Sequence, residues 1–73
     1  MKITEIKSMM EQVPFRPFTV LLENGHDLKV TRDSELLFPR NRPGLMIIFN
    51  KDGVMTIFED HAVTAIEQNS LKP

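Results

Sequence analysis

Residues 18–31, Phe-Thr-Val-Leu-Leu-Glu-Asn-Gly-His-Asp-Leu-Lys-Val-Thr, carry the clearest structural pattern in the chain. The first half has Phe18, Val20 and Leu22 at every second position, and the second half repeats this alternation with Leu28 and Val30. Alternating apolar residues lie on one face of a β-strand. Because the halves are joined by Asn-Gly, the sequence predicts strands over residues 18–23 and 26–31 that form a hairpin with a type I′ turn.

The segment before this hairpin predicts a helix over residues 3–13. Its apolar residues recur at spacings of three and four and therefore share one face: Ile3, Ile6, Met10 and Val13. Thr4 is the expected N-cap residue. Pro14 is expected to end the helix, because it has no N–H group and restricts the residue before it.

Three further strands are predicted after the hairpin, over residues 45–50, 54–58 and 62–67. The apolar run Leu45–Phe49 is typical of a strand covered on both faces. Residues 50–53 are expected to form a second turn, and residues 39–44 an exposed loop. The pattern leaves two conformations open for residues 34–38, a short strand or a single helical turn.

One helix followed by four or five short antiparallel strands predicts a single, mainly β domain over residues 1–73. Two architectures satisfy this order of elements. One is a small SH3-like or Sm-like barrel, and the other is a curled four- to five-stranded sheet with the helix packed on it.

The composition restricts the classes of function. The chain has no cysteine, which excludes disulfides, thiolate zinc sites and thiol nucleophiles and favours a reducing, cytoplasmic location. Neither a signal peptide nor a membrane span is expected from the sequence. The net charge of −1, with both signs interspersed, produces no general attraction to nucleic acid or anionic lipid.

The residues that carry chemistry predict a protein that is not an enzyme. The serines stand in no nucleophile motif, and the glycines occupy turns rather than a phosphate-binding loop. His26 and His61 are each next to an aspartate, but no recognisable metal-ligand spacing is present. We therefore expect no catalytic residue, no cofactor and no metal.

The candidate binding residues are four: Arg40, Arg42, Lys51 and His61. Arg40 and Arg42 form the only basic cluster, which Arg16 and Lys51 would join if their loops meet. Such a cluster positions phosphate groups, or alternatively makes a turn soluble. His61 is suited to contacting a base or a carboxylate across a subunit joint. Its alternative role is that of a turn histidine bonded to the backbone or to a neighbouring acid.

Two segments make the chain resemble the Sm-like (Hfq-like) family of small β-barrels. Residues 20–25, Val-Leu-Leu-Glu-Asn-Gly, are similar to the hairpin of the first family motif, and residues 58–66, around His61-Ala62, are similar to the second. The resemblance implies an N-terminal helix, five bent strands closed into a barrel, and RNA binding. The segment Pro-Phe-Arg-Pro-Phe is also similar to short uncharacterised bacterial proteins, which implies no function.

The departures from the Sm-like pattern concern the RNA site. Asp60 replaces the lysine of the family motif, and with Glu59 it places two carboxylates where phosphates would approach. The predicted strands also hold more apolar residues than one helix covers. We therefore expect a non-enzymatic small barrel module that acts by protein–protein interaction or self-assembly. The alternative is an Sm-like RNA-binding regulator.

Overall fold

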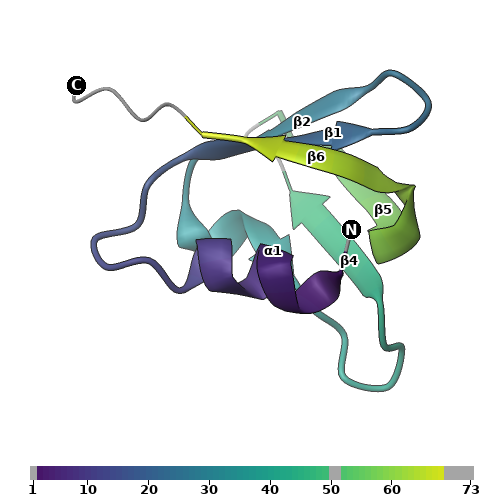
Figure 1. Cartoon of the computed structure of the whole chain (residues 1–73), viewed down its shortest axis with the longest axis horizontal. Helices are drawn as coiled ribbons and strands as arrows, with labels where there is room; N and C mark the ends of the chain where they lie inside the picture. Colours follow the sequence, from purple (N-terminus) through teal and green to yellow (C-terminus); the bar gives the residue numbers. More distant parts are fainter. Residues whose placement is uncertain (1, 50–51, 69–73) are drawn as a thin grey trace.

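A computed structural model of the chain describes residues 2–49 and 52–68. These residues form, in order, α1 (Ile3–Met10), β1 (Phe18–Leu22), β2 (Asp27–Val30), the 3-10 turn η1 (Asp33–Glu35), β3 (Leu36–Leu37), β4 (Leu45–Phe49), β5 (Met55–Glu59), the 3-10 turn η2 (Asp60–Ala62) and β6 (Val63–Glu67). The strands make two antiparallel sheets of three, β2-β1-β6 and β3-β4-β5 (Figure 1). The predicted mainly β domain with one N-terminal helix is confirmed.

The described strands do not close into a barrel. β1 pairs with β2 and β6, β4 pairs with β3 and β5, and no pairing between described residues joins the two sheets. The chain turns away after β2 and enters η1, so β3 belongs to the other sheet. The expected barrel is therefore not confirmed, and two sheets replace the single curled sheet that was the other expectation.

The predicted first hairpin is confirmed, but its turn type is wrong. Phe18 pairs with Val30 and Leu21 with Asp27. Gly25 alone within this turn has a positive φ, of 90°, whereas a type I′ turn needs two such residues. The Gly25 N–H donates to the Leu22 carbonyl at 3.0 Å, and the Leu22 N–H donates to the His26 carbonyl at 2.9 Å. These bonds describe a three-residue loop with glycine in the left-handed position.

The core lies between the two sheets and is closed by α1. Its buried residues come from alternate strand positions and from the helix: Ile6, Phe18, Val20, Leu22, Val30, Leu36, Met46, Ile48, Phe58 and Val63. In Figure 1, α1 is seen below β6 and in front of β4. Ile6 is fully buried, and Ile3, Met9 and Met10 pack against the same core. The alternation in the sequence thus predicted correctly which face of β1 is buried.

The helix is shorter than predicted. It begins at Ile3 with Lys2, not Thr4, as the N-cap residue, and the Lys2 N–H donates to the Glu5 carboxylate at 3.2 Å. It ends at Met10, and Val13 is 95% exposed, so the assignment of Val13 to the apolar face was wrong. Pro14 disfavours the helical conformation at Val13, so the last turn of the predicted helix does not form. No helix in the described part of the chain is long and apolar enough to cross a membrane.

The segment after the helix is held to the end of β6 by amide hydrogen bonds. The side chains of Gln12 and Gln68 donate to each other, at 3.2 and 2.8 Å. Gln68 also donates to the Arg16 carbonyl at 3.2 Å. These bonds join residues more than fifty positions apart and fix α1 relative to the first sheet.

The later strands match the prediction except at their ends. β5 begins at Met55 rather than Val54, and Ala62 belongs to η2 rather than to β6. Asn50, the predicted end of β4, lies outside the described residues. The expectation that Leu45–Phe49 is covered on both faces was wrong. Met46 and Ile48 are buried, but Phe49 is 39% exposed, because the core covers only the inner face.

Residues 33–37 contain both of the conformations that the sequence left open. Asp33–Glu35 is a 3-10 turn and Leu36–Leu37 is a short strand. The Glu35 carboxylate accepts hydrogen bonds from the Thr31 N–H at 2.7 Å, the Thr31 hydroxyl at 2.9 Å and the Arg32 N–H at 3.2 Å. The Thr31 N–H is the main reason that the pKa of Glu35 lies below its ordinary value. Partial burial opposes this, whereas the Thr31 hydroxyl, the Arg32 N–H and the Arg32 charge lower the pKa further.

We expect Glu35→Gln to lower the free energy of unfolding by about 1 kcal/mol near neutral pH, because the charged acceptor of these bonds is lost. A lowered folded-state pKa stabilises the fold above the ordinary carboxyl pKa, and this contribution disappears as the pH falls through the folded-state value. The difference between wild type and variant should therefore be smaller at an acidic pH below the ordinary carboxyl pKa than near neutral pH. Urea unfolding at both pH values measures it. The control Glu23→Gln should change little at either pH, and an unchanged gap for Glu35→Gln would contradict the prediction.

Gly44 is the glycine whose replacement should be most costly. Its φ is +86°, and an added Cβ would lie 3.1 Å from Oδ1 of Asp60. Gly25, with a φ of +90°, has nothing within 4 Å of such a Cβ. We expect Gly25→Ala to destabilise the fold by about 1 kcal/mol through backbone strain alone, and Gly44→Ala to destabilise it more. Urea unfolding of the two variants gives the comparison, and equal losses would show that the Asp60 side chain moves aside freely.

Candidate functional site

The basic loop predicted from the sequence lies between β3 and β4. Arg40 and Arg42 are both exposed in it. The loop ends where the Leu45 N–H donates to the Arg42 carbonyl at 3.0 Å and the Asp60 N–H donates to the Gly44 carbonyl at 2.8 Å. The second bond ties the loop to η2, so the loop is anchored at its C-terminal end.

Arg40 lines an open hollow of about 340 Å³. The other lining residues come from α1 and from the same loop: Ile3, Lys7, Phe38, Pro39, Pro43 and Gly44. The ammonium group of Lys7 lies 5.4 Å from the centre of the Phe38 ring, a cation–π distance. Two cations beside an aromatic ring can hold an anionic or planar group. We call this site the basic hollow.

The structure does not bring the other predicted site residues into the basic hollow. Its lining includes neither Arg42 nor Arg16, and Lys51 lies outside the described residues. His61 is in η2, where its Nε2 atom lies 3.8 Å from Oε1 of Glu59. Both side chains are mostly exposed, at 71% and 57%. His61 therefore has the neighbouring acid that its alternative role required.

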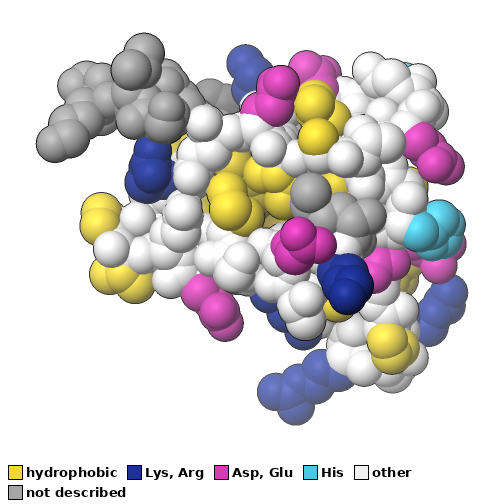
Figure 2. All heavy atoms as spheres, in the orientation of Figure 1, with side chains coloured by type: hydrophobic (Ala, Val, Ile, Leu, Met, Phe, Trp, Pro, Cys, Tyr) yellow, Lys and Arg dark blue, Asp and Glu magenta, His cyan; other side chains and the backbone are white. Residues whose placement is uncertain are grey.

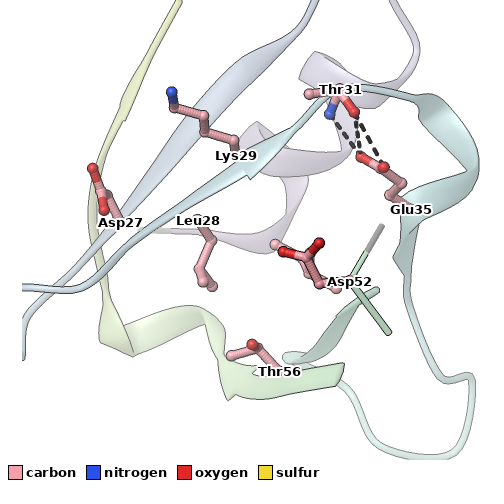
Figure 3. A pocket seen from close by; sticks show the side chains of 8 residues that line it. Asp27, Leu28, Lys29, Thr31, Glu35, Asp52 and Thr56 are labelled. Carbon is pink, nitrogen blue, oxygen red and sulfur yellow. Dashed lines mark hydrogen bonds between the residues drawn. The ribbon is translucent and has the colours of Figure 1, made fainter. Parts of the chain in front are cut away.

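A larger hollow of about 480 Å³ lies where β2 of the first sheet faces β4 and β5 of the second. It is lined by residues from both sheets and from the connections between them: Asp27, Leu28, Lys29, Thr31, Glu35, Ile48, Asp52 and Thr56. Figure 3 shows Leu28 directed toward Thr56 across this space, and the bonds from Thr31 to Glu35 at its rim. We call it the inter-sheet hollow, since it marks the opening between the two sheets.

The second sheet has an exposed apolar face. Its outward residues are Leu37 on β3, Leu45, Ile47 and Phe49 on β4, and Met55 and Ile57 on β5. We call these six residues the outer face. Leu37 pairs with Ile47 and Ile47 with Ile57, so one apolar row crosses all three strands. Phe49 pairs with Met55 beside this row.

The outer face is open to solvent over much of its area. Leu37, Met55 and Ile57 are 47%, 51% and 54% exposed. Directly paired side chains on one face of a sheet lie roughly 5 Å apart, which makes the row continuous. The largest exposed apolar patches of monomeric proteins are often functional, whereas apolar residues scattered singly need no explanation. The outer face is contiguous across three strands and so is not of the scattered kind.

The charged side chains of the described residues do not form a patch of one sign that would identify a binding site. Figure 2 shows acidic and basic side chains interspersed over the visible face, which agrees with the net charge of −1. Within residues 2–49 and 52–68, no three histidine, aspartate or glutamate side chains come together as a metal site would require. His26 is exposed beside the first turn, and its backbone N–H donates to Oδ1 of Asn24 at 3.0 Å.

Two parts of these sites were not predicted from the sequence. Lys7 was given no role, and only the packing of α1 places it over Phe38 and beside Arg40. Leu37 was left without a role because residues 34–38 had no fixed conformation. The signal for the outer face was present, since β4 and β5 carry apolar residues at odd as well as even positions.

Comparison of the chain with protein-family models, with curated proteins and with solved structures gives no match.

Proposed function

We propose that this chain is a non-enzymatic interaction module that acts by protein–protein interaction or self-assembly through the outer face. The observation that supports the proposal most strongly is the apolar row Leu37, Ile47 and Ile57, which crosses all three strands of one sheet and is exposed at Leu37 and Ile57. Water leaves such a surface favourably when another apolar surface covers it. The outer face thus supplies the driving force for association.

The strands cannot shift so as to bury the outer face without exposing residues of the core. Met46, Ile48 and Phe58 occupy the inner face of the same strands and are buried. A shift of one residue in register would exchange the two faces and expose these core residues instead. The outer face is therefore a fixed property of the folded chain, available to a partner without a conformational change.

The hollows favour binding over catalysis. Neither His26 nor His61 lines the basic hollow or the inter-sheet hollow. The Thr31 hydroxyl contacts Glu35, but this carboxylate also accepts two backbone N–H groups, and its pKa is lowered. A carboxylate with a lowered pKa is a poor general base near neutral pH. These residues form a cap on η1 rather than a catalytic pair.

Ile47→Lys tests the proposal, because it places a charge at the centre of the outer face while leaving the core unchanged. We expect immobilised wild-type protein to capture a partner from an extract of its native cells, or to self-associate, and the variant to lose at least about tenfold in binding. Quantitative capture and sedimentation velocity give the two measurements.

The matched control is Val13→Lys, which makes the same kind of substitution at a residue that is 95% exposed and lies outside the outer face. It should bind as the wild type does. Circular dichroism checks that both variants are folded. Equal binding by all three proteins, or no binding and no self-association by any, would refute the interaction module.

A second candidate function, an Sm-like RNA-binding regulator, is supported by the basic hollow. Lys7 and Arg40 supply two cations, and Phe38 supplies a ring on which a base can stack. The order of elements, one N-terminal helix followed by short antiparallel strands, also supports this candidate. Glu59 and Asp60 weigh against it, because they repel phosphate.

RNA binding is tested by the fluorescence anisotropy of a labelled single-stranded RNA over a salt series. If the basic hollow binds RNA, affinity falls steeply with salt, and Lys7→Ala or Arg40→Ala each reduces the slope by about 0.7. Lys29→Ala, in the inter-sheet hollow, is the control and should leave the slope unchanged. Binding that is absent, or insensitive to salt, would exclude this candidate.

A further inference from the structure

β5 is an edge strand with an open hydrogen-bonding side. It pairs with β4 alone among the described strands of its sheet. Its five residues, Met-Thr-Ile-Phe-Glu, include neither lysine nor proline. Natural proteins guard edge strands with such residues, with short strands or with covering segments, because an open edge pairs readily with another strand.

The other edges are less suited to pairing than β5. β2 carries the exposed charges Asp27 and Lys29. β6 ends at an exposed glutamate, as β5 does, but it has no large apolar side chain that is as exposed as those of β5. β3 has only two residues. β5 combines five paired positions with two outer-face residues, Met55 and Ile57, that are about half exposed. It is therefore the edge most suited to adding a strand.

The backbone pattern identifies which groups of β5 face this edge. The Asp60 N–H donates to the Gly44 carbonyl at 2.8 Å, one step beyond the pair Leu45–Glu59. Hydrogen-bonded pairs alternate along an antiparallel ladder, so Phe58 and Thr56 are the next residues bonded to β4. The N–H and C=O groups of Met55, Ile57 and Glu59 consequently point away from β4. Met55 and Ile57 of the outer face therefore also present backbone groups at this edge.

We infer that two copies of this chain associate by antiparallel pairing of β5 with β5, about a two-fold axis at Ile57. This inference goes beyond the proposed use of the outer face, because the second copy pairs with the edge of β5 and leaves Leu37 and Ile47 uncovered. Ile57 exchanges both backbone hydrogen bonds with Ile57 of the second copy, and the Glu59 N–H donates to the Met55 carbonyl of the second copy. The Glu59 carbonyl takes no part in this pairing, because Glu59 is the N-cap residue of η2. The β3-β4-β5 sheet of one copy joins the same sheet of the second copy, and the two form one sheet of six strands. The apolar row then continues from Leu37 of one copy to Leu37 of the other.

The charge on Glu59 of β5 favours antiparallel over parallel pairing of the two copies. In the antiparallel register the two Glu59 carboxylates stand at opposite ends of the paired strands, roughly 13 Å apart along them. A parallel register would place them side by side, and like charges directly opposite each other are destabilising. With a net charge of −1, the chain has little general repulsion against its own copy. A two-fold arrangement pairs the same strand edge of both copies, so neither β5 edge stays open.

Charge complementation at position 57 tests the pairing, because Ile57 faces itself across the axis. Native mass spectrometry and sedimentation equilibrium of the full chain should show a dimer. Ile57→Lys and Ile57→Glu should each weaken dimerisation roughly tenfold or more, and mixing the two variants should restore a heterodimer. The same two substitutions at Val13 should leave the wild-type dimer intact in every combination.

A second measurement does not depend on how the charged variants fold. Because the chain has no cysteine, Ile57→Cys introduces a single thiol, and a short bismaleimide should join two copies. Val13→Cys should not be cross-linked. A wild-type monomer at all concentrations would overturn the dimer and leave a different protein partner for the outer face. A dimer without complementation and without cross-linking at position 57, or a larger ring, would overturn the β5 register. Failure of the Ile47→Lys capture experiment would instead overturn the interaction module itself.

Discussion

Pairing of β1 along both of its edges is the interaction on which the rest of the structure depends. One edge holds β2 through a local hairpin, and the other holds β6, the last described strand, so the two ends of the fold meet at β1. Its inward residues Phe18, Val20 and Leu22 are all buried. The amide bonds between Gln12 and Gln68 then fix the segment after α1 to the end of β6. Helix, first strand and last strand therefore form one connected unit.

Only one face of the β3-β4-β5 sheet packs against this unit. Met46, Ile48 and Phe58 fill the core, and α1 helps to close it through Ile6. On the opposite side of β4 and β5, apolar residues continue at the odd positions, and Phe49, Met55 and Ile57 are exposed there. A folded unit of this size buries only roughly 60% of the surface that its unfolded chain exposes, so part of its apolar strand surface stays in water. Association is the physical means by which such a surface leaves water, which is why the outer face carries the proposed function.

The electrostatic features of the molecule are local rather than global. The basic hollow draws Lys7 from α1 and Arg40 from the loop before β4, and Phe38 lies beneath the Lys7 ammonium group. Glu59 and His61 lie close together at η2, and Glu35 stabilises the turn before β3. None of these groups builds a surface of one sign. This arrangement suits a chain that meets a nearly neutral partner, such as a second copy of itself.

Sequence patterns alone determined the elements whose signals are local. The alternation in residues 18–31 predicted the first hairpin and its core face, and the spacing of Ile3, Ile6 and Met10 predicted a helix and its buried side. Val13 and the I′ turn were wrong because each depends on where the neighbouring chain goes: Pro14 acts before the helix is complete, and Gly25 alone takes the left-handed conformation. Tertiary structure decided everything that requires two distant segments to meet. It separated the strands into two sheets, brought Lys7 to Phe38 and Arg40, and added Leu37 to the row of Ile47 and Ile57. Apolar periodicity shows which face of a strand is buried, but only packing determines which strands share a sheet and which apolar face remains uncovered.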